Sequence, residues 1–334
     1  MAIEFFTGFE GCGSTADIAT LFDVSDFIHV SASGFGGGKA ARSGSTNGRS
    51  LVKYFSGAKT KVIGFHFNNA VVGSSSTINY NEQHFLVNFL GPNINFWINS
   101  TSSLQARLGR DGPIIATWNV ALTGSAFNHI QIEVFSGASV GTIKVLVNGA
   151  LVEEEKTGLN TGGSDMTGIS IGTASSSTFT VDNIYLSDQI EGELVSILRK
   201  PASDASVQFT PSTGTDNYAM VDDMAQDGDT TYVESDTVGH VDTYEYEDVP
   251  SGYQVKAVSL VTVARKDDAG ARTLQPVSVQ DATQRSVGPE IVLATAYPTT
   301  TGSGAIVTLS TAPDSTEWSR SKVNDVKWGF KVAS

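Results

Sequence analysis

The chain has 334 residues, of which 40% are hydrophobic and 17% charged, so it holds enough apolar material for about two folded domains and is not intrinsically disordered. The 35 acidic residues outnumber the 21 basic ones and give a net charge of -14. Because a surface that neutralises phosphates needs clustered Lys and Arg, this balance excludes a general nucleic-acid-binding protein.

Two features of the sequence bear on where the chain folds. Cys12 is the single cysteine, so no intrachain disulfide can form and neither half of the chain depends on one. The first residues lack the basic and apolar regions of a signal peptide, and no apolar run approaches the roughly 20 residues that cross a bilayer. We therefore expect a protein that folds in a cytoplasm without membrane insertion.

Apolar runs predict strands throughout the first 190 residues. The run 127–135 alternates most clearly, with Ile130, Ile132 and Val134 on one face. Asn148-Gly149 lies between two apolar runs and is the strongest hairpin signal in the chain. Gly- and Ser-rich stretches separate the runs, which is typical of loops. The predicted strands are 61–67, 84–90, 94–98, 127–135, 142–152, 168–172 and 179–186.

The composition changes near residue 190, which indicates a second domain. The segment 216–248 holds 11 acidic residues and no Lys or Arg, so it needs solvent exposure, a bound cation or a basic partner surface to relieve the repulsion. The segment 191–206 contains Pro201 and a strand-like run at 194–198, and we expect it to be an ordered joint. Further strands are predicted at 241–246, 255–265, 274–279, 291–297, 305–309 and 326–332.

Five stretches of the first half occur in an order typical of one β-sandwich family. Residues 5–10 (FFTGFE) are similar to its opening strand, and 48–51 (GRSL) to the strand after its first long loop. Residues 127–134 and 141–151 match its histidine-containing strand and its Asn-Gly hairpin, and 180–188 its closing strand, which returns beside the first. Together they resemble the concanavalin A-like lectin/laminin-G jelly roll. This family contains lectins, glycosidases and structural modules, so the resemblance alone decides no function.

The glycosidase branch needs two carboxylates on one strand face, flanking the bond that is cut. Glu133 stands alone on its strand, and the consecutive run 153–155 alternates between faces, which is typical of a solvated hairpin edge. We therefore predict no catalytic residues and no enzymatic activity. Calcium, common in the lectin branch, needs about six to eight oxygen ligands. The few candidate carboxylates in this half are Asp111, Asp165, Asp182 and Asp188.

The second half shows a different set of motifs. They begin with the joint (EGELVSILRKPASDASVQFTPSTGTDNY) and continue with 221–223, 227–233, 258–270 and 318–332. Together they resemble a β-sandwich module that recurs in tailed-phage virion proteins, although Gly192-Glu193 stands where that module usually has Gly-Asp. The resemblance implies a structural role in a phage particle and no enzymatic activity.

Two groups of residues in this half are candidate sites. Asp227-Gly228-Asp229 is a tight-turn sequence that could hold a cation such as calcium together with Asp222 and Asp223, or be a plain turn. Trp318 and Trp328 could stack on a sugar or contact a partner, or could anchor the core of a small sandwich.

We therefore predict an all-β protein of two consecutive β-sandwich (jelly-roll-like) domains at 1–190 and 203–334, with a joint at 191–202. The resemblances imply a non-enzymatic structural protein of a tailed-phage virion, a capsid decoration or tail-accessory protein, assembled in the host cytoplasm. Its partners would be other virion proteins and further copies of itself, with no required cofactor and with possible calcium binding. The alternatives are a tail adhesin that binds a host surface glycan, and a carbohydrate-binding module of an exported enzyme.

Overall fold

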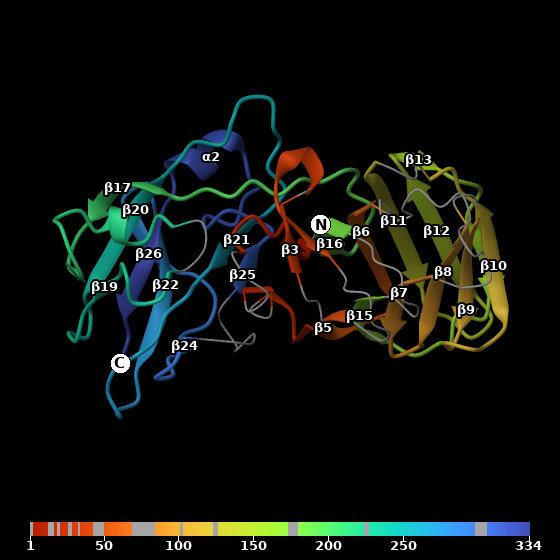
Figure 1. Cartoon of the computed structure of the whole chain (residues 1–334), viewed down its shortest axis with the longest axis horizontal. Coiled ribbons are helices and arrows are strands. Elements are labelled where there is room, and N and C mark those ends of the chain that lie inside the picture. The colour runs from red at the N-terminus through yellow and green to blue at the C-terminus, as the bar shows by residue number, and fades with distance from the viewer. Residues whose placement is uncertain are drawn as a thin grey trace. The chain divides into compact units, whose positions relative to one another are not determined.

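The computed structural model shows two compact units whose regular secondary structure is almost entirely β-strand (Figure 1). Unit 1 comprises Met1–Glu10 and Ser14–Ser196, and unit 2 comprises Gly11–Gly13 and Ile197–Ser334. The structure describes residues 3–12, 17–18, 21–25, 29–32, 34–42, 50–68, 84–100, 103–122, 126–172, 180–223, 227–297 and 306–334. The predicted all-β class is confirmed. Within these residues no helix has the length and apolar character needed to cross a membrane.

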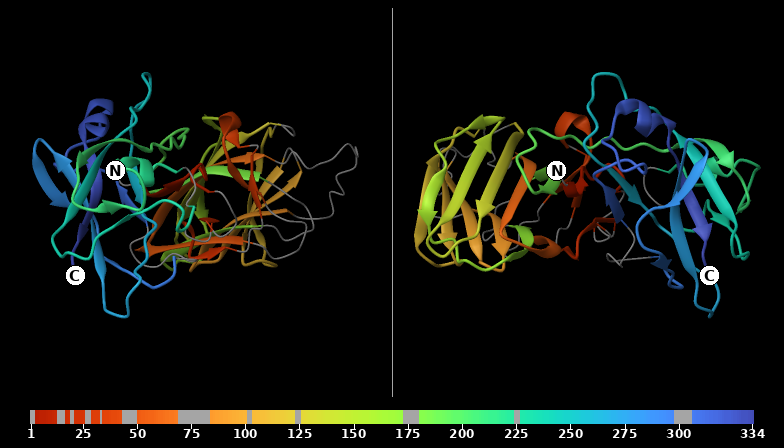
Figure 2. Two further views of the ribbon diagram at one scale, coloured as in Figure 1. Left: turned by 60° about the vertical axis from the view of Figure 1, so that its left-hand side comes forward. Right: turned by 180° about the vertical axis from the view of Figure 1, so that it is seen from behind.

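Unit 1 is a sandwich of two antiparallel sheets, whose layers Figure 2 shows from two further directions. Sheet A has the strand order β13-β12-β11-β6-β16-β4-β3, with β1 beside β16 and β14 beside β12. Its strands are β1 (Ile3–Thr7), β3 (His29–Ser31), β4 (Ala40–Arg42), β6 (Thr60–Asn68), β11 (Asn128–Phe135), β12 (Gly141–Val147), β13 (Ala150–Leu151), β14 (Lys156–Leu159) and β16 (Thr180–Ser187).

Sheet B has the strand order β10-β9-β8-β7-β15-β5-β2. Its strands are β2 (Val24–Ser25), β5 (Ser50–Ala58), β7 (His84–Leu90), β8 (Ile94–Ser100), β9 (Ser103–Leu108), β10 (Ile114–Asn119) and β15 (Met166–Gly172). A short 3-10 turn, η1 (Phe35–Gly37), precedes β4.

The core of unit 1 lies between the two sheets, and the alternation of the strands explains why. Ile130, Ile132 and Val134 of β11 are buried on the inner face of sheet A, as the sequence predicts. Phe96 on sheet B is fully buried, and Phe89 packs against its ring. β1 pairs antiparallel with β16, so the expected return of the closing strand beside the first is confirmed.

The hairpin predicted at Asn148-Gly149 is confirmed, and it connects β12 and β13. Asn148 and Gly149 have φ values of 50° and 78°. A two-residue turn with both central φ values positive matches the twist of the flanking strands, and Asn and Gly are the residues that adopt it at least cost.

Unit 2 is built on a six-stranded antiparallel sheet, sheet C, ordered β17-β20-β26-β22-β23 with β24 beside β22. Its strands are β17 (Pro201–Ser206), β20 (Val241–Tyr246), β22 (Thr273–Gln280), β23 (Thr283–Ser286), β24 (Ile291–Val292) and β26 (Lys327–Val332). Two ribbons add β18 (Thr210–Pro211) with β19 (Val233–Glu234), and β21 (Val258–Val261) with β25 (Ile306–Leu309). The helical segments are η2 (Tyr218–Met220) and α2 (Arg320–Asp325).

Some predicted strands differ in extent. The strand-like run 194–198 forms no regular secondary structure, and strands appear in only part of 255–265 and 291–297. In 194–198 the apolar residues Val195, Ile197 and Leu198 remain substantially exposed, so they bury no sheet face. Apolar content without a neighbouring strand to pair with is not sufficient to make a strand.

Candidate functional site

The outer face of sheet A, turned away from the core, carries a buried polar cluster. His66 on β6 lies opposite His129 on β11 and opposite Asp182 on β16, and all three side chains are nearly inaccessible. Gln131 and Tyr185 occupy the next outward position of the same face, on either side of Gly64. Buried polar groups need hydrogen-bond partners. The partners of this cluster therefore identify the segments that cover the outer face of sheet A.

The last segment of unit 1 is one cover of this face. The Tyr185 hydroxyl lies 2.7 Å from the Gly192 carbonyl oxygen and 2.8 Å from Gln131 Oε1. Gln131 Oε1 also accepts a hydrogen bond from Gly192 N. The ring of Tyr185 lies directly over Gly64, where a Cβ atom would come within 2.0 Å of its Cζ. Glycine at position 64 therefore lets the ring reach the joint.

His66 and Asn183 extend this attachment. Asn183 Nδ2 donates to His66 Nδ1 (3.3 Å), so the proton of the neutral ring lies on Nε2, which donates to Glu193 Oε1 (2.8 Å). Asn183 has a positive φ of 48° at a β-bulge, and its Oδ1 accepts a hydrogen bond from Ser196 N. Residues 192–196 are thus held on sheet A.

The loop around η1 is the other cover. Asp182 Oδ2 accepts from Phe35 N (2.8 Å), and Glu10 Oε2 accepts from Lys39 N (2.8 Å). The Phe35 ring stacks on His66 at 3.8 Å between centroids. This loop contains the glycine-rich run 34–38, which therefore packs against carboxylates of its own chain.

Burial sets the protonation of the cluster. It raises the pKa of Asp182 to about 7, although two backbone amides lower it in part. Burial, with the nearby His66 second, lowers the pKa of His129 to about 4, so this ring is neutral at pH 7. Burial likewise lowers the pKa of His66, partly offset by Glu193. Since these groups are engaged with chain segments, the cluster is a structural anchor.

The outer face of sheet B carries a line of polar residues between apolar ones such as Trp97, Val52 and Ile114. Asn88, Asn95 and Ser170 each alternate with fully buried apolar residues, so their side chains point away from the core. The register places Arg107, Asn95, Asn88 and Ser170 directly opposite one another on β9, β8, β7 and β15. We call these four residues the polar row.

Cross-strand neighbours lie about 4.5–5.5 Å apart between Cβ atoms, so the polar row spans about 15 Å of surface. Asn95 donates through Nδ2 to the carbonyl and side-chain oxygens of Asn93. Asn88 Oδ1 and Arg107 Nε are buried and have no hydrogen-bond partner among the described residues. Gln105 lies beside the row, opposite Trp97. Asn95 is thus buried and held by its own chain. Of the row and its neighbour Gln105, the partly exposed side chains are Asn88, Gln105, Arg107 and Ser170.

The carboxylates considered for catalysis or calcium in unit 1 lie elsewhere. Glu133 pairs with Lys144 on the outer face of sheet A (3.3 Å), and Asp165 pairs with Lys59 (3.0 Å). None of the described strand residues that point outward from sheet B is acidic. A pair of carboxylates flanking a bound sugar is therefore absent from that part of the face.

The acidic segment 216–248 is relieved in a way that the sequence analysis did not consider. Asp222 lies 3.5 Å from Lys200, Asp229 lies 3.0 Å from Arg265 and Glu245 lies 3.3 Å from Lys327. Cations distant in sequence thus approach these three carboxylates. Asp242 is fully buried, and accepts hydrogen bonds from two backbone amides and from side chains.

The predicted cation site is not assembled in the described residues. Asp223 and Asp227 both accept from the Thr231 hydroxyl, while Asp222 and Asp229 face separate basic side chains. No group of three or more His, Cys, Asp or Glu residues in the described ranges could hold a metal ion. Calcium binding therefore stays a prediction without a site.

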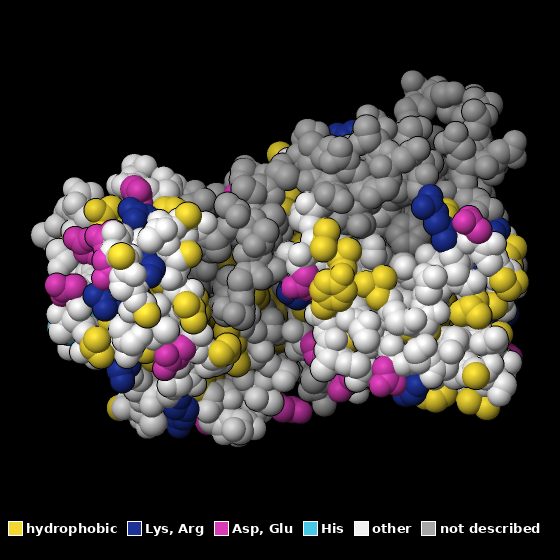
Figure 3. Space-filling view, turned by 90° about the horizontal axis from the view of Figure 1, so that it is seen from below, with side chains coloured by type: hydrophobic (Ala, Val, Ile, Leu, Met, Phe, Trp, Pro, Cys, Tyr) yellow, Lys and Arg dark blue, Asp and Glu magenta, His cyan; other side chains and the backbone are white. Residues whose placement is uncertain are grey.

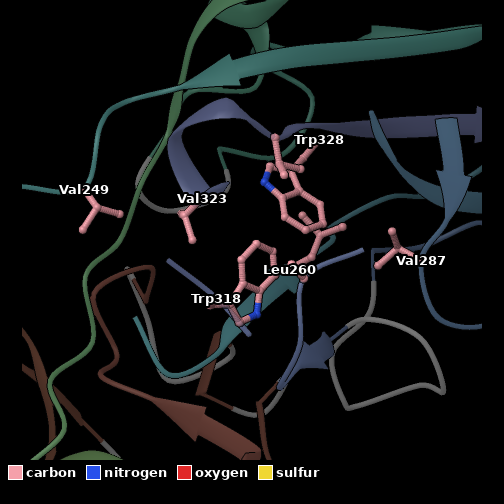
Figure 4. Packing of buried hydrophobic residues seen from close by; sticks show 8 residues of the cluster. Val249, Leu260, Val287, Trp318, Val323 and Trp328 are labelled. Atoms are coloured by element: carbon pink, nitrogen blue, oxygen red, sulfur yellow. The ribbon is translucent and has the colours of Figure 1, made fainter. Parts of the chain in front are cut away.

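The prediction of a surface role for the two tryptophans is wrong. Trp318 and Trp328 are 7% and 3% exposed, with ring centroids 6.1 Å apart. Figure 4 shows them inside the hydrophobic cluster that also contains Leu260 and Val323. Trp318 Nε1 donates to the Leu309 carbonyl (2.9 Å), which satisfies the one polar group of the ring. They are core anchors and cannot stack on a sugar.

The distribution of charge can be followed on one face of the molecule (Figure 3). Among the described residues visible in Figure 3, basic side chains lie singly between acidic and apolar ones, without a basic patch. This agrees with the net charge of -14.

No family model matches the chain, and a comparison with curated proteins found no match. Among solved structures, the catalytic domain of a glycoside hydrolase family 131 protein from Coprinopsis cinerea is 12% identical, with 59% of this chain and 98% of that chain covered and a TM-score of 0.40. The receptor-binding domain of botulinum neurotoxin type G is 6% identical, with 77% of each chain covered and a TM-score of 0.43.

Galectin LEC-6 of Caenorhabditis elegans is 14% identical, with 42% of this chain and 93% of that chain covered and a TM-score of 0.28. At such scores these likenesses assign no function.

The sequence analysis missed the polar row, although part of its signal is visible in the sequence. Asn88 and Asn95 are single polar residues inside the apolar runs predicted as strands at 84–90 and 94–98. Alternation places both on outward faces. The alignment with Arg107 depends on the register of three strands, which no local pattern specifies.

Proposed function

We propose that this chain is a non-enzymatic carbohydrate-binding protein whose unit 1 binds glycan on the outer face of sheet B. The observation that supports this is a set of partly exposed polar side chains on β9, β7 and β15 of this face: Arg107, Gln105, Asn88 and Ser170. Asn95, between Arg107 and Asn88, is buried and donates to Asn93. Amides offer a donor and an acceptor together, which suits the vicinal hydroxyls of a sugar. A rigid sheet holds such groups in fixed positions.

Hydrolysis is not part of this proposal. Retaining and inverting glycosidases need two carboxylates about 5–10 Å apart across the scissile bond. The described outward positions of sheet B carry none. We therefore propose binding without turnover at this face.

The test is glycan-array binding by the full chain and by the double variant Asn88→Ala/Gln105→Ala. Removing the hydrogen bonds of two amides, each worth about 1 kcal/mol, should weaken binding about tenfold or more. Gln284→Ala is the matched control, because Gln284 is an exposed amide on strand β23 of unit 2. Failure of the wild-type chain to bind any glycan, or equal binding by the double variant, would contradict the proposal.

We further propose that the protein is a structural component of a tailed-phage particle, assembled in the host cytoplasm. Support comes from the resemblance of the second half to a phage virion module, from Gly192 to the end of the chain. A glycan-binding unit 1 would then contact the host surface, which keeps the adhesin alternative open.

Mass spectrometry and labelling of purified particles test this second proposal. We expect the protein in fixed stoichiometry, as a symmetric shell or ring if it decorates the capsid, or at the tip of the tail if it is an adhesin. Absence of the protein from washed particles would refute a structural role.

A further inference from the structure

The side chain of Asn183 connects a titratable residue of sheet A to the joint. Its Nδ2 donates to His66 Nδ1 (3.3 Å), and its Oδ1 accepts from Ser196 N (2.8 Å). Asn183 and His66 are both buried, so the loss of either bond leaves a buried polar group unsatisfied. The orientation of this one amide is therefore shared between His66 and the joint.

His66 can keep this arrangement only while its ring is neutral. Its Nε2 donates to Glu193 Oε1 (2.8 Å), so Nδ1 is the nitrogen that accepts from Asn183. A protonated imidazole carries a hydrogen on both nitrogens, and Nδ1–H would then face the amide hydrogens of Asn183. Turning the amide by 180° offers Oδ1 to His66 but places Nδ2 against Ser196 N, which is also a donor. No orientation of the amide satisfies both partners of a protonated ring.

The other charged or titratable groups near His66 come from each element that packs on this part of sheet A. They are His129, Asp182, Tyr185, Glu191, Glu193, Glu10 and Lys39. Burial raises the pKa of Asp182 to about 7 and lowers that of His129 to about 4, so both side chains are neutral between these values. Glu193 stabilises a charge on His66 from the Nε2 side. Asn183 is the residue that has to adjust at Nδ1.

We propose that His66, Asn183 and Ser196 form an acid-sensitive latch, in which protonation of His66 turns the Asn183 amide and releases Ser196 from sheet A. Burial lowers the pKa of His66 below its ordinary value of 6.5, and Glu193 offsets part of this effect. The folded protein therefore takes up this proton less readily than the unfolded chain, and the attachment is lost as the pH falls. The latch is closed at pH 7 and opens in moderate acid.

The latch controls how much of the joint is unattached. At its far end Arg199 donates to the carbonyl oxygens of Tyr246 and Val323, which holds it on unit 2. Between Ser196 and Arg199 lie two residues, Ile197 and Leu198, which are each 38% exposed. When Ser196 is released, the attachments that flank the free stretch are those of Glu193 and Arg199. The unattached stretch then grows from 197–198 to 194–198.

Hydrogen exchange with single-residue resolution, measured on the full chain at pH 7.5 and pH 5, tests the proposal. Exchange rates are corrected for their intrinsic dependence on pH, and the protonation of His66 is followed by NMR of its ring nitrogens. We expect protection of the Ser196 amide to fall about tenfold or more as His66 becomes protonated. Protection of the β11 amides should stay unchanged over the same range.

Two variants separate the latch from a general effect of acid. In Asn183→Asp one carboxylate oxygen still accepts from Ser196 N while the other accepts from a protonated His66, so Ser196 should stay protected at pH 5 and His66 should bind its proton at a higher pH. Aspartate also tolerates the positive φ of 48° at this position. His66→Asn cannot be protonated and should likewise keep Ser196 protected at pH 5.

His240→Asn is the matched control, because His240 is a partly buried histidine of unit 2 whose Nδ1 lies 3.0 Å from the Ser235 hydroxyl. It removes a titratable ring from the other unit and should leave the response of Ser196 to pH unchanged.

Four results would overturn the proposal. Ser196 could keep its protection after His66 is protonated, or His66 could stay neutral until sheet A unfolds. Protection could be lost from β6, β11 and β16 together with Ser196, which would show acid unfolding of unit 1 and not the opening of a latch. Finally, Asn183→Asp could lose the protection of Ser196 at the same pH as the wild type.

Discussion

Replacing Asp182 by Asn should change how the stability of unit 1 depends on pH. Asp182 is fully buried on β16, where Oδ2 accepts from Phe35 N and Oδ1 from Asn183 N. Burial is the largest influence on this carboxyl and raises its pKa from 3.8 to about 7. Asparagine has the same shape, keeps one acceptor oxygen and carries no charge at any pH.

The sign follows from proton binding. Between about pH 4 and pH 7 the folded protein holds a proton on Asp182 that the unfolded chain has already released, so this group stabilises the fold at low pH and progressively less as the pH rises. A difference of about 3 pKa units corresponds to about 4 kcal/mol, at about 1.4 kcal/mol per unit. The variant should therefore gain up to about 4 kcal/mol relative to the wild type between pH 4 and pH 8.

His129 has the opposite dependence, because its lowered pKa makes the folded state lose stability as the pH falls below about 6.5. The two effects partly cancel in the wild type, so the informative quantity is the difference between variant and wild type. His129 contributes equally to both proteins and disappears from that difference.

Hydrogen exchange followed by mass spectrometry measures the difference separately for each unit. Peptides from β6, β11 and β16 report on unit 1, whereas global denaturation would mix two units that need not unfold together. Asp111→Asn, at an exposed position, serves as the control and should show no such trend. If the stability difference between Asp182→Asn and wild type is the same at pH 4.5 and pH 8, then burial does not raise this pKa and the reasoning is refuted.

Three further predictions concern the joint, the core of unit 2 and the acidic turn. Tyr185→Phe leaves Gly192 O without its hydroxyl partner, so it should destabilise unit 1 by about 1–3 kcal/mol and speed limited proteolysis within 189–196; unchanged cleavage would contradict the anchoring role. Trp328→Ala should cost about 3–5 kcal/mol in hydrogen exchange of sheet C, and a cost below about 1 kcal/mol would contradict its core position. Calcium should not raise the melting temperature of the protein, because Asp229 already faces Arg265; a rise that Asp229→Asn abolishes would restore the cation site.

Local patterns in the sequence determined most of the strands. The alternation of 127–135 gave β11, and Asn148-Gly149 gave a turn with two positive φ values. These features depend on side-chain period and on backbone sterics within a few residues, which a sequence displays directly. A catalytic carboxylate pair would also leave a local pattern, because it requires two acidic residues at fixed spacing on one strand.

The role of individual side chains was decided only by the tertiary structure. Trp318 and Trp328 could have been surface or core residues, and depth of burial depends on how β21, β25 and α2 pack on sheet C. Asp222 and Asp229 belong to a segment without Lys or Arg, but their partners Lys200 and Arg265 come from other segments. An ion pair between residues far apart in the sequence cannot be recognised from either segment alone.

The same holds for the two polar faces of unit 1. Asn88 and Asn95 are recognisable in the sequence as outward positions, but only the register of β7, β8 and β9 places them opposite Arg107. His66 and Asp182 lie in apolar strands, but only the folded chain shows that its own later and earlier segments cover them. The sequence by itself thus determined the strands and their faces, while tertiary packing decided which polar face is covered, because covering requires segments that only the fold brings together.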